Sequence, residues 1–101
     1  MSYNLLILED NALLIETLED FLSDKGFTCT LACNGQEALN VCYTRRFDLY
    51  LLDVNVPQLN GFDFLKELRM AGDKTPAIFV TSYQDKASIL EGFSIGGDDY
   101  I

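Results

Sequence analysis

The sequence predicts an α/β protein built on a doubly wound parallel sheet. Strand-like and helix-like segments alternate along all 101 residues, and short loops join them, which implies right-handed crossovers. The strand-like runs at 5–8 and 77–80 are continuously apolar, as is typical of parallel strands that are covered on both faces. With 49% apolar residues the chain suits a single small domain over 1–101.

Each element of this sheet can be placed along the chain. Strands are expected at 5–8, 27–32, 48–52 and 77–80, and 98–101 reads as the approach to a fifth. Helices are expected at 11–25, 34–46, 61–71 and from 82 to about 95. The inward side of the first helix should carry Leu14, Leu18, Phe21 and Leu22. Asn34 should cap the second helix while Glu37 reaches back toward that cap.

The charge balance restricts the partners that this segment can bind. Seven basic and sixteen acidic residues give a net charge of −9, which repels nucleic-acid phosphates and suits a divalent cation or a basic protein surface. Three cysteines without a C-x-x-C pair, and no histidine, argue against zinc. No signal peptide and no run of membrane-spanning length is present, so we expect a cytoplasmic protein that does not enter a membrane.

Acidic side chains follow two of the predicted strands at the point where each strand ends. Glu9 and Asp10 come after 5–8, and Asp53 comes after 48–52. Because the carboxyl ends of parallel strands meet at one edge, where ligands bind in such sheets, we expect these acids to converge. Three carboxylates together repel one another and raise at least one pKa unless a cation or a proton offsets the charge.

Oxygen ligands without histidine or thiolate favour a hard ion, and Mg²⁺ is the natural candidate. We expect Asp10 and Asp53 to bind it directly, Glu9 through water, and the backbone carbonyl of Asn55 from the loop. With the ion in place, Asp53 can attack phosphorus and form an acyl phosphate. The hydroxyl of Thr81 can then hydrogen-bond a phosphoryl oxygen, and Ser82 is small enough to leave the approach open.

Each residue also has a simpler interpretation on its own. Asp10 or Asn11 can cap the first helix, and Asp53 can be a turn residue. Thr81 can be an ordinary β-branched strand residue, and Gly61 an ordinary residue at a helix start. The spacing of the set favours a site, because all the acids lie at strand exits and none at strand entries.

Five short motifs carry a resemblance to a known family. They are Leu-Ile-Leu-Glu9-Asp10, Leu-Leu-Asp53-Val-Asn-Val-Pro57, Gly61, Val80-Thr81-Ser82 and Gly96-Gly97-Asp98-Asp99-Tyr100. From 3 to 101 the chain resembles a response-regulator receiver domain of a two-component signal-transduction system. The resemblance implies the flavodoxin-like strand order 2-1-3-4-5 and a phosphoprotein that signals to a downstream output domain or protein.

The resemblance also implies a role for each matching residue. Asp53 would accept a phosphoryl group from a histidine kinase or phosphotransfer protein, and Glu9 and Asp10 would hold Mg²⁺. Thr81 would be the switch hydroxyl and Tyr100 the switch aromatic. Such a domain is not an enzyme in the usual sense, because at most it catalyses its own phosphorylation and dephosphorylation.

The sequence departs from the family pattern at one position, the lysine that follows the switch aromatic. The family has a lysine three residues after the switch aromatic, whereas this sequence stops one residue after Tyr100. We therefore expect a domain that lacks most of the fifth strand and the whole fifth helix, with Mg²⁺ binding retained, phosphorylation impaired and signalling lost or greatly reduced. We also expect 77–80 to be an unpaired apolar edge, an apolar patch to be exposed on one face, and the chain to self-associate there.

Three other functions remain open. A haloacid-dehalogenase-type phosphatase also uses an Asp nucleophile and Mg²⁺, but it generally needs a second Asp two residues later, where this chain has Asn55. A flavodoxin-type module would need a loop rich in Ser, Thr and Gly after Leu8, and acids stand there instead. A pseudo-receiver would serve only as an interaction module without being phosphorylated.

Overall fold

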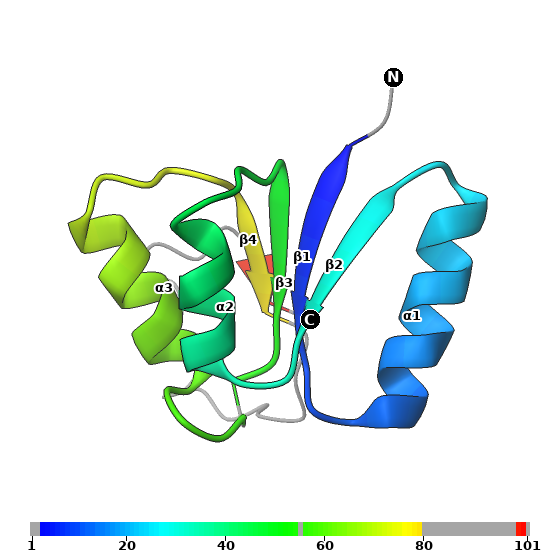
Figure 1. Cartoon of the computed structure of the whole chain (residues 1–101), viewed down its shortest axis with the longest axis horizontal. Helices are drawn as coiled ribbons and strands as arrows, with labels where there is room; N and C mark the ends of the chain where they lie inside the picture. The colour runs from blue at the N-terminus through cyan, green and yellow to red at the C-terminus, as the bar shows by residue number, and fades with distance from the viewer. Residues whose placement is uncertain (1–2, 55, 80–98, 101) are drawn as a thin grey trace.

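The chain forms a five-stranded parallel sheet in the order β2-β1-β3-β4-β5, as the resemblance implied. The computed structural model describes residues 3–54, 56–79 and 99–100. The strands are β1 (Asn4–Leu8), β2 (Thr28–Ala32), β3 (Leu49–Leu52), β4 (Ala77–Phe79) and β5 (Asp99–Tyr100). In Figure 1 the strands β1 to β4 run downward, so their carboxyl ends lie together at the bottom of the view.

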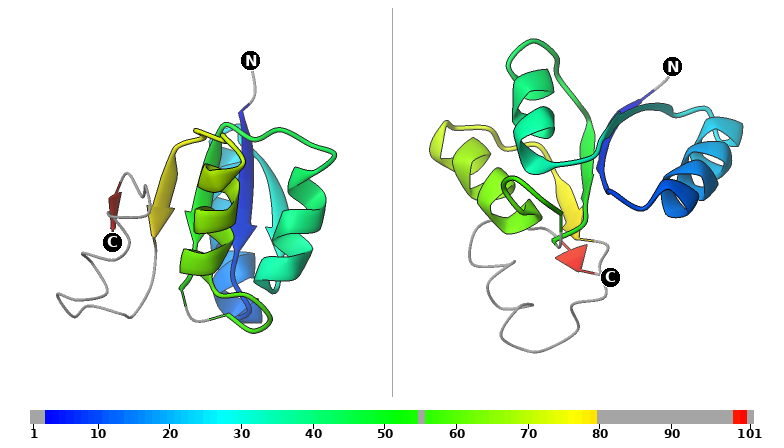
Figure 2. Two further views of the ribbon diagram at one scale, coloured as in Figure 1. Left: turned by 90° about the vertical axis from the view of Figure 1, so that its left-hand side faces the viewer. Right: turned by 60° about the horizontal axis from the view of Figure 1, so that its bottom comes forward.

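Helices cover both faces of the sheet. The described helices are α1 (Ala12–Asp24), α2 (Gly35–Cys42) and α3 (Gly61–Met70). Figure 2 shows α2 and α3 side by side on one face and α1 on the other. The helix predicted from 82 onward lies outside the described residues.

An asparagine caps each of these helices. The side chains of Asn11, Asn34 and Asn60 each accept a hydrogen bond from the backbone N–H three residues later, at 3.1, 2.8 and 2.9 Å respectively. These bonds satisfy donors that have no partner inside a helix, which explains where the helices begin. The capping of α2 by Asn34 was predicted correctly.

Two details of α2 differ from the prediction. The Glu37 carboxylate accepts a hydrogen bond of 3.4 Å from the backbone N–H of Cys33, not from that of Asn34. The helix ends at Cys42, four residues before the predicted end. Tyr43 to Arg46 are exposed while Phe47 is buried, because the chain must turn back there to carry the Phe47 ring into the core.

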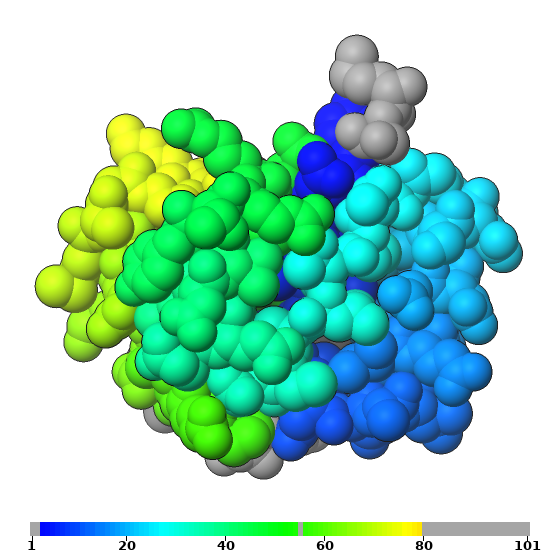
Figure 3. Space-filling model, viewed as in Figure 1, coloured from blue at the N-terminus to red at the C-terminus, as the bar shows by residue number. Residues whose placement is uncertain are grey.

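The main core lies between the sheet and the pair α2 and α3. Alternate strand residues point into it, which places Leu6 and Leu8 of β1 beside Tyr50 and Leu52 of β3. The helices contribute Ala38, Leu39, Phe62, Phe64, Leu65 and Leu68 to the same cluster. In the space-filling view, α2 covers the middle of this face of the molecule (Figure 3).

The opposite face is less completely covered in the described part of the chain. No side chain of α1 is fully buried, and Leu14 and Phe21 are 37% and 60% exposed. Of the predicted apolar side of this helix, Leu14 and Phe21 are therefore left exposed, whereas Leu18 and Leu22 are half-buried as expected. The reason is that α1 packs on β2, near the edge of the sheet, so only a narrow stripe of the helix is shielded.

The predicted unpaired edge at 77–80 was also wrong. β4 pairs with β3 on one side and with β5 on the other, where Ile78 lies opposite Asp99 and Phe79 opposite Tyr100. The described part of β4 is Ala77–Phe79, and the two residues of β5 pair with Ile78 and Phe79 of it. The short β5 is therefore the outermost strand on this side of the sheet.

Candidate functional site

Three carboxylates meet at the carboxyl ends of β1 and β3. One oxygen from each of Glu9, Asp10 and Asp53 lies within 4.8 Å of the others. The convergence that the sequence predicted is therefore present in the fold. The site lies at the lower edge of the sheet in Figure 1, where the strands end.

The backbone of the sheet holds two of these acids in place. The N–H of Asp53 donates a 2.9 Å hydrogen bond to the carbonyl of Leu8, which continues the pairing of β3 with β1. The N–H of Glu9 donates a 3.0 Å bond to the carbonyl of Ala32 in β2. Because both residues extend the ladder beyond the strands, their side chains start from fixed positions.

Glu9 is the buried member of the cluster, with 5% of its surface exposed. Its Oε2 accepts hydrogen bonds from the backbone N–H groups of Asp10 and Asn11, at 2.9 and 3.1 Å. Burial raises the pKa of Glu9 to about 7, and the neighbouring Asp53 carboxylate raises it too. The two backbone N–H donors act in the opposite direction and lower the pKa. Without a cation, Glu9 therefore holds a proton at pH values below about 7, as expected for crowded carboxylates.

Asp10 is exposed, and its side chain does not cap α1. Asn11 does so, by accepting the N–H of Leu14. The structure thus decides between the two capping residues that the sequence left open. It leaves the Asp10 carboxylate at the edge of the cluster, in a position to bind a cation together with Glu9 and Asp53.

Gly61 has a role at this site that its sequence position did not reveal. A Cβ atom built on Gly61 would collide with the backbone carbonyl oxygen of Asp53. The N–H of Gly61 also donates a 3.1 Å hydrogen bond to the carbonyl of Val54. Only glycine permits this approach, so the start of α3 packs directly against the backbone of the candidate phosphoacceptor. The reading of Gly61 as an ordinary helix-start residue was wrong.

The loop between β3 and α3 is braced against the start of α2. Gln58 and Leu59 have positive φ angles of 51° and 84°, which non-glycine residues adopt rarely. The carbonyl of Gln58 accepts a 3.0 Å bond from the N–H of Gln36, and the backbone of Leu59 lies where a side chain on Gly35 would be. These contacts hold the loop that follows Asp53 in one conformation.

Several predicted site residues cannot be placed in this geometry. Asn55, Thr81 and Ser82 lie outside the described residues. Tyr100 belongs to β5, and its backbone pairs with Phe79.

The donor set suits a hard divalent cation. All three side chains offer carboxylate oxygens, one of them half-buried and one buried, at the separation that a single ion can bridge. Mg²⁺ binds such oxygens while it keeps several of its waters. The exposed position of Asp10 leaves one side of the cluster open to solvent.

The described helices give no indication of a membrane span. Among residues 3–54, 56–79 and 99–100, no helix is both long enough and apolar enough to cross a bilayer.

Comparison with known proteins agrees with this geometry. The family model described as response regulator receiver domain matches residues 5–101. The chain is 38% identical to the transcriptional regulatory protein DltR of Streptococcus agalactiae, over 96% of this chain and 43% of that protein. It is also 38% identical to the transcriptional regulatory protein CrdR of Helicobacter pylori, over 100% of this chain and 48% of that protein. The chain thus spans less than half the length of these curated relatives.

Solved structures show the same fold. The receiver domain of the Francisella response regulator 1452 superimposes with a TM-score of 0.93 at 28% identity, covering 98% of this chain and 82% of that one. The chemotaxis protein CheY4 of Vibrio cholerae gives a TM-score of 0.93 at 28% identity, covering 100% of this chain and 86% of that one. With the family match over nearly its whole length, this chain belongs to the response regulator receiver domains of two-component systems.

Proposed function

We propose that Asp53 is the phosphoacceptor of this receiver domain, in a reaction that depends on Mg²⁺. The observation that carries the proposal is the convergence of Asp53 with Glu9 and Asp10, whose ligand oxygens lie within 4.8 Å of one another at the carboxyl edge of the sheet. The domain proposed to carry this site is the whole segment 1–101.

In the proposed reaction, an Asp53 carboxylate oxygen attacks the phosphorus of a phosphohistidine on a histidine kinase or phosphotransfer protein. The new P–O bond forms as the P–N bond breaks, and the electron pair of that bond returns to the imidazole nitrogen. The product is an acyl phosphate on Asp53. Bound Mg²⁺ would supply positive charge between the carboxylates and the phosphoryl oxygens.

The other residues of the chain prepare this attack. Glu9 and Asp10 would hold the ion, and the carbonyl of Asn55 would complete its protein ligands. The contact of Gly61 with the Asp53 backbone supports a fixed direction of attack, because it restricts how the backbone around Asp53 can move. Thr81 would bind a phosphoryl oxygen, Ser82 would leave access open, and Tyr100 would follow Thr81 in the switch.

The alternative of a small-molecule phosphatase has less support. The residue two positions after Asp53 is Asn55, whose amide cannot transfer the proton that the acid–base Asp of such enzymes transfers. A receiver needs no acid–base residue there, because the donor imidazole is itself a good leaving group. The pseudo-receiver alternative has less support as well, since the carboxylate cluster is complete.

Amide chemical shifts can test the proposal. Mg²⁺ is titrated into ¹⁵N-labelled protein with and without beryllofluoride, a mimic of the phosphoryl group. We expect Mg²⁺-dependent shifts around Asp53 and Thr81 and a further shift at both positions with beryllofluoride. The variant D53N should lose the beryllofluoride response, while D63N, which changes an exposed carboxylate in the first turn of α3, should keep it.

Two results would contradict the proposal. Unchanged signals around Asp53 in the presence of both reagents would exclude a phosphoacceptor site there. Multiple turnovers with a small phosphate ester, lost in D53N, would favour the phosphatase instead.

For the partners, we propose a histidine kinase or phosphotransfer protein upstream and an output domain or protein downstream, with no direct contact to nucleic acid.

We also propose weak self-association, for which the support is the exposure of Leu13 and Phe21 on α1, at 73% and 60%. Light scattering after size exclusion should show a mass that rises with protein concentration. The double variant L13S/F21S should reduce that rise, and a clean monomer at high concentration would exclude self-association.

A further inference from the structure

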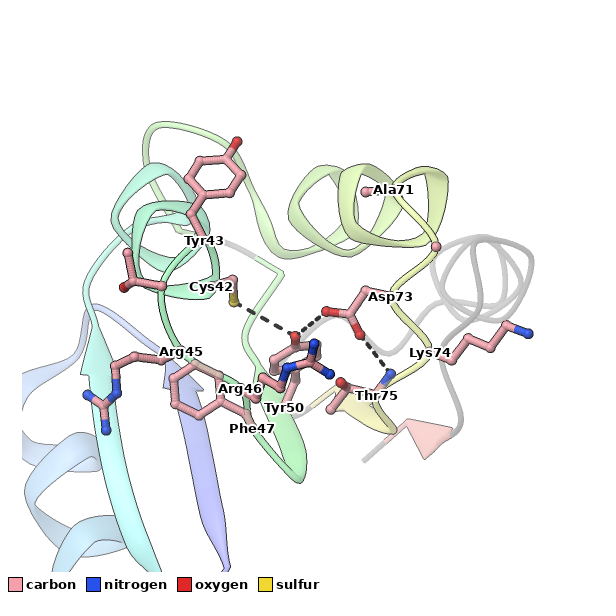
Figure 4. Close-up of a pocket in the computed structure, with 12 residues that line it drawn as sticks. Cys42, Tyr43, Arg45, Arg46, Phe47, Tyr50, Ala71, Asp73, Lys74 and Thr75 are labelled. Carbon is pink, nitrogen blue, oxygen red and sulfur yellow. Dashed lines mark hydrogen bonds between the residues drawn. The ribbon is translucent and has the colours of Figure 1, made fainter.

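A pocket of about 580 Å³ lies at the end of the sheet opposite Asp53. It opens between the loop that follows α2 and the loop that follows α3, both of which lie at the top of Figure 1. Figure 4 shows the residues that line it, among them Arg45, Arg46, Tyr50, Asp73, Lys74 and Thr75. Its volume falls in the range of roughly 300–1,000 Å³ that is usual for small-molecule sites.

The charge of this lining is opposite to that of the chain. Arg45, Arg46 and Lys74 carry three positive charges and Asp73 one negative charge, so the lining has a net charge of +2 on a chain of −9. Three of the seven basic residues are therefore gathered around one concavity. A local positive field on an acidic protein attracts anions to that one place.

Two of these cations are available to a ligand. Arg46 and Lys74 are exposed, and within the described part of the chain no hydrogen bond or ion pair holds either of them. Arg45 differs, because its guanidinium lies 5.6 Å from the centre of the Phe47 ring. It contributes charge to the rim while its side chain packs on an aromatic face.

The only acid of the lining already has its own donors. The hydroxyl of Tyr50 donates a 2.6 Å hydrogen bond to Asp73 Oδ2, and the N–H of Thr75 donates a 2.8 Å bond to Oδ1 (Figure 4). Burial alone would raise the pKa of Asp73, but these donors and the charge of Arg69 outweigh it, so the pKa lies below its ordinary value. The negative charge of Asp73 is thus satisfied within the protein and leaves Arg46 and Lys74 unneutralised.

We propose that this pocket binds a small phosphorylated molecule, whose phosphate oxygens pair with Arg46 and Lys74. Arg46 and Lys74 both line this concavity. A guanidinium and an ammonium suit phosphate oxygens, because the first offers a planar fork and the second a compact charge. The proposal commits to a small molecule rather than an acidic protein, because the volume of the hollow that these cations line is that of a small-molecule site. The site needs no metal, which separates it from the Asp53 cluster.

Binding can be measured with Mg²⁺ removed. Inorganic phosphate, pyrophosphate and ATP are titrated separately into ¹⁵N-labelled 101-residue chain in excess EDTA, so that the Asp53 site cannot bind phosphate through an ion. We expect saturable amide shifts at residues 44–46 and 73–75, strongest for the ligands with more than one phosphate. In R46E/K74E the affinity should fall by about tenfold or more.

A charge-matched control separates a site from general attraction. The variant K25E/K66E makes the same change in net charge at two exposed lysines outside the pocket, and it should bind as the unchanged chain does. Equal losses in both double variants, or shifts that do not saturate, would overturn the proposal. A response to an acidic peptide alone, with none to pyrophosphate or ATP, would also overturn it. Unchanged signals of the buried Leu6 and Leu52 would show that each variant remains folded.

Discussion

The carboxylates of Glu9 and Asp53 meet across the ends of β1 and β3, with oxygens within 4.8 Å of each other, and burial together with this neighbour raises the pKa of Glu9 to about 7. A proton on Glu9 therefore stabilises two carboxylates that would otherwise repel each other. The proposed metal ion must displace that proton before it can bind both groups fully, which couples metal binding to pH.

The first prediction concerns stability without metal. The folded chain holds the Glu9 proton more tightly than the unfolded chain, in which the pKa is near 4.5. The contribution of Glu9 to the free energy of unfolding is thus fully present below about pH 4.5, and it is lost as the pH rises through about 7. The slope in this window is at most about 1.4 kcal/mol per pH unit.

Urea denaturation between pH 4 and 8 in EDTA gives the free energy of unfolding of the unchanged chain and of E9Q, in which residue 9 cannot ionise. The difference between these two free energies measures the effect. Saturating Mg²⁺ should remove the decline, because it stabilises the charged form of Glu9. A difference that is constant over this range would mean that the pKa of Glu9 is not raised.

Asp10 should matter for metal binding and little for folding. Its carboxylate is exposed and takes no part in the cap of α1, so D10N should weaken Mg²⁺ binding by about tenfold or more. It should change the free energy of unfolding by less than about 0.5 kcal/mol. The neighbouring N11A removes the bond to Leu14 and should cost about 1 kcal/mol of stability. Calorimetric Mg²⁺ titration and urea denaturation of both variants test these two expectations. A larger loss of stability in D10N than in N11A would contradict the assignment of Asn11 as the cap.

Gly61→Ala should disturb the proposed phosphoacceptor, Asp53, through its backbone. The added methyl group would meet the carbonyl oxygen of Asp53, so we expect a loss of about 2 kcal/mol or more together with weaker Mg²⁺ binding. Gly26→Ala is the matched comparison. Its φ of +89° strains alanine, but nothing lies near the new methyl group, so stability should fall while Mg²⁺ binding stays unchanged. Equal effects of the two variants on metal binding would show that the Gly61 contact is unimportant for the site.

The bond between Tyr50 and Asp73 should be measurable in a double-mutant cycle. Tyr50 is 2% exposed and donates at 2.6 Å to a carboxylate, so the coupling energy of Y50F and D73N should be about 1.5–3 kcal/mol. The pKa of Asp73 is lowered, so this stabilisation is present above its ordinary value of 3.8 and is lost as the pH falls through the folded value. Y43F, which changes a tyrosine that is 72% exposed, should have almost no effect. No coupling at pH 7 would contradict the assignment.

The acidic cluster was predictable because it follows from topology. In a parallel sheet, residues that follow strands must meet at one edge, so Glu9, Asp10 and Asp53 could be brought together from the strand pattern alone. The cap at Asn34 and the order of the strands could be predicted as well. Local hydrogen bonding determines the cap, and the family pattern gives the strand order.

Other features depend on contacts between distant residues, and no periodic pattern encodes them. The sequence treats Tyr50 as part of an apolar run, and nothing in it indicates that its hydroxyl meets Asp73, 23 positions later. The collision that excludes a side chain at Gly61 likewise exists only when α3 is packed against Asp53. The exposure of Phe21 was missed because helical spacing identifies an apolar stripe but not how much of it the sheet covers.

The lack of any fully buried side chain in α1 has a consequence for motion. Among the described helices, only α1 has no fully buried side chain, so its amide hydrogens should exchange with solvent well before those of α3, whose Phe64 and Leu65 are completely enclosed. Asp10 lies immediately before α1, in the turn that joins the helix to β1. An ion bound by Asp10 and Asp53 would therefore link α1 to β3, the central strand of the sheet. Part of the free energy of ion binding would then stabilise α1, and its amide hydrogens would exchange more slowly when the ion is bound.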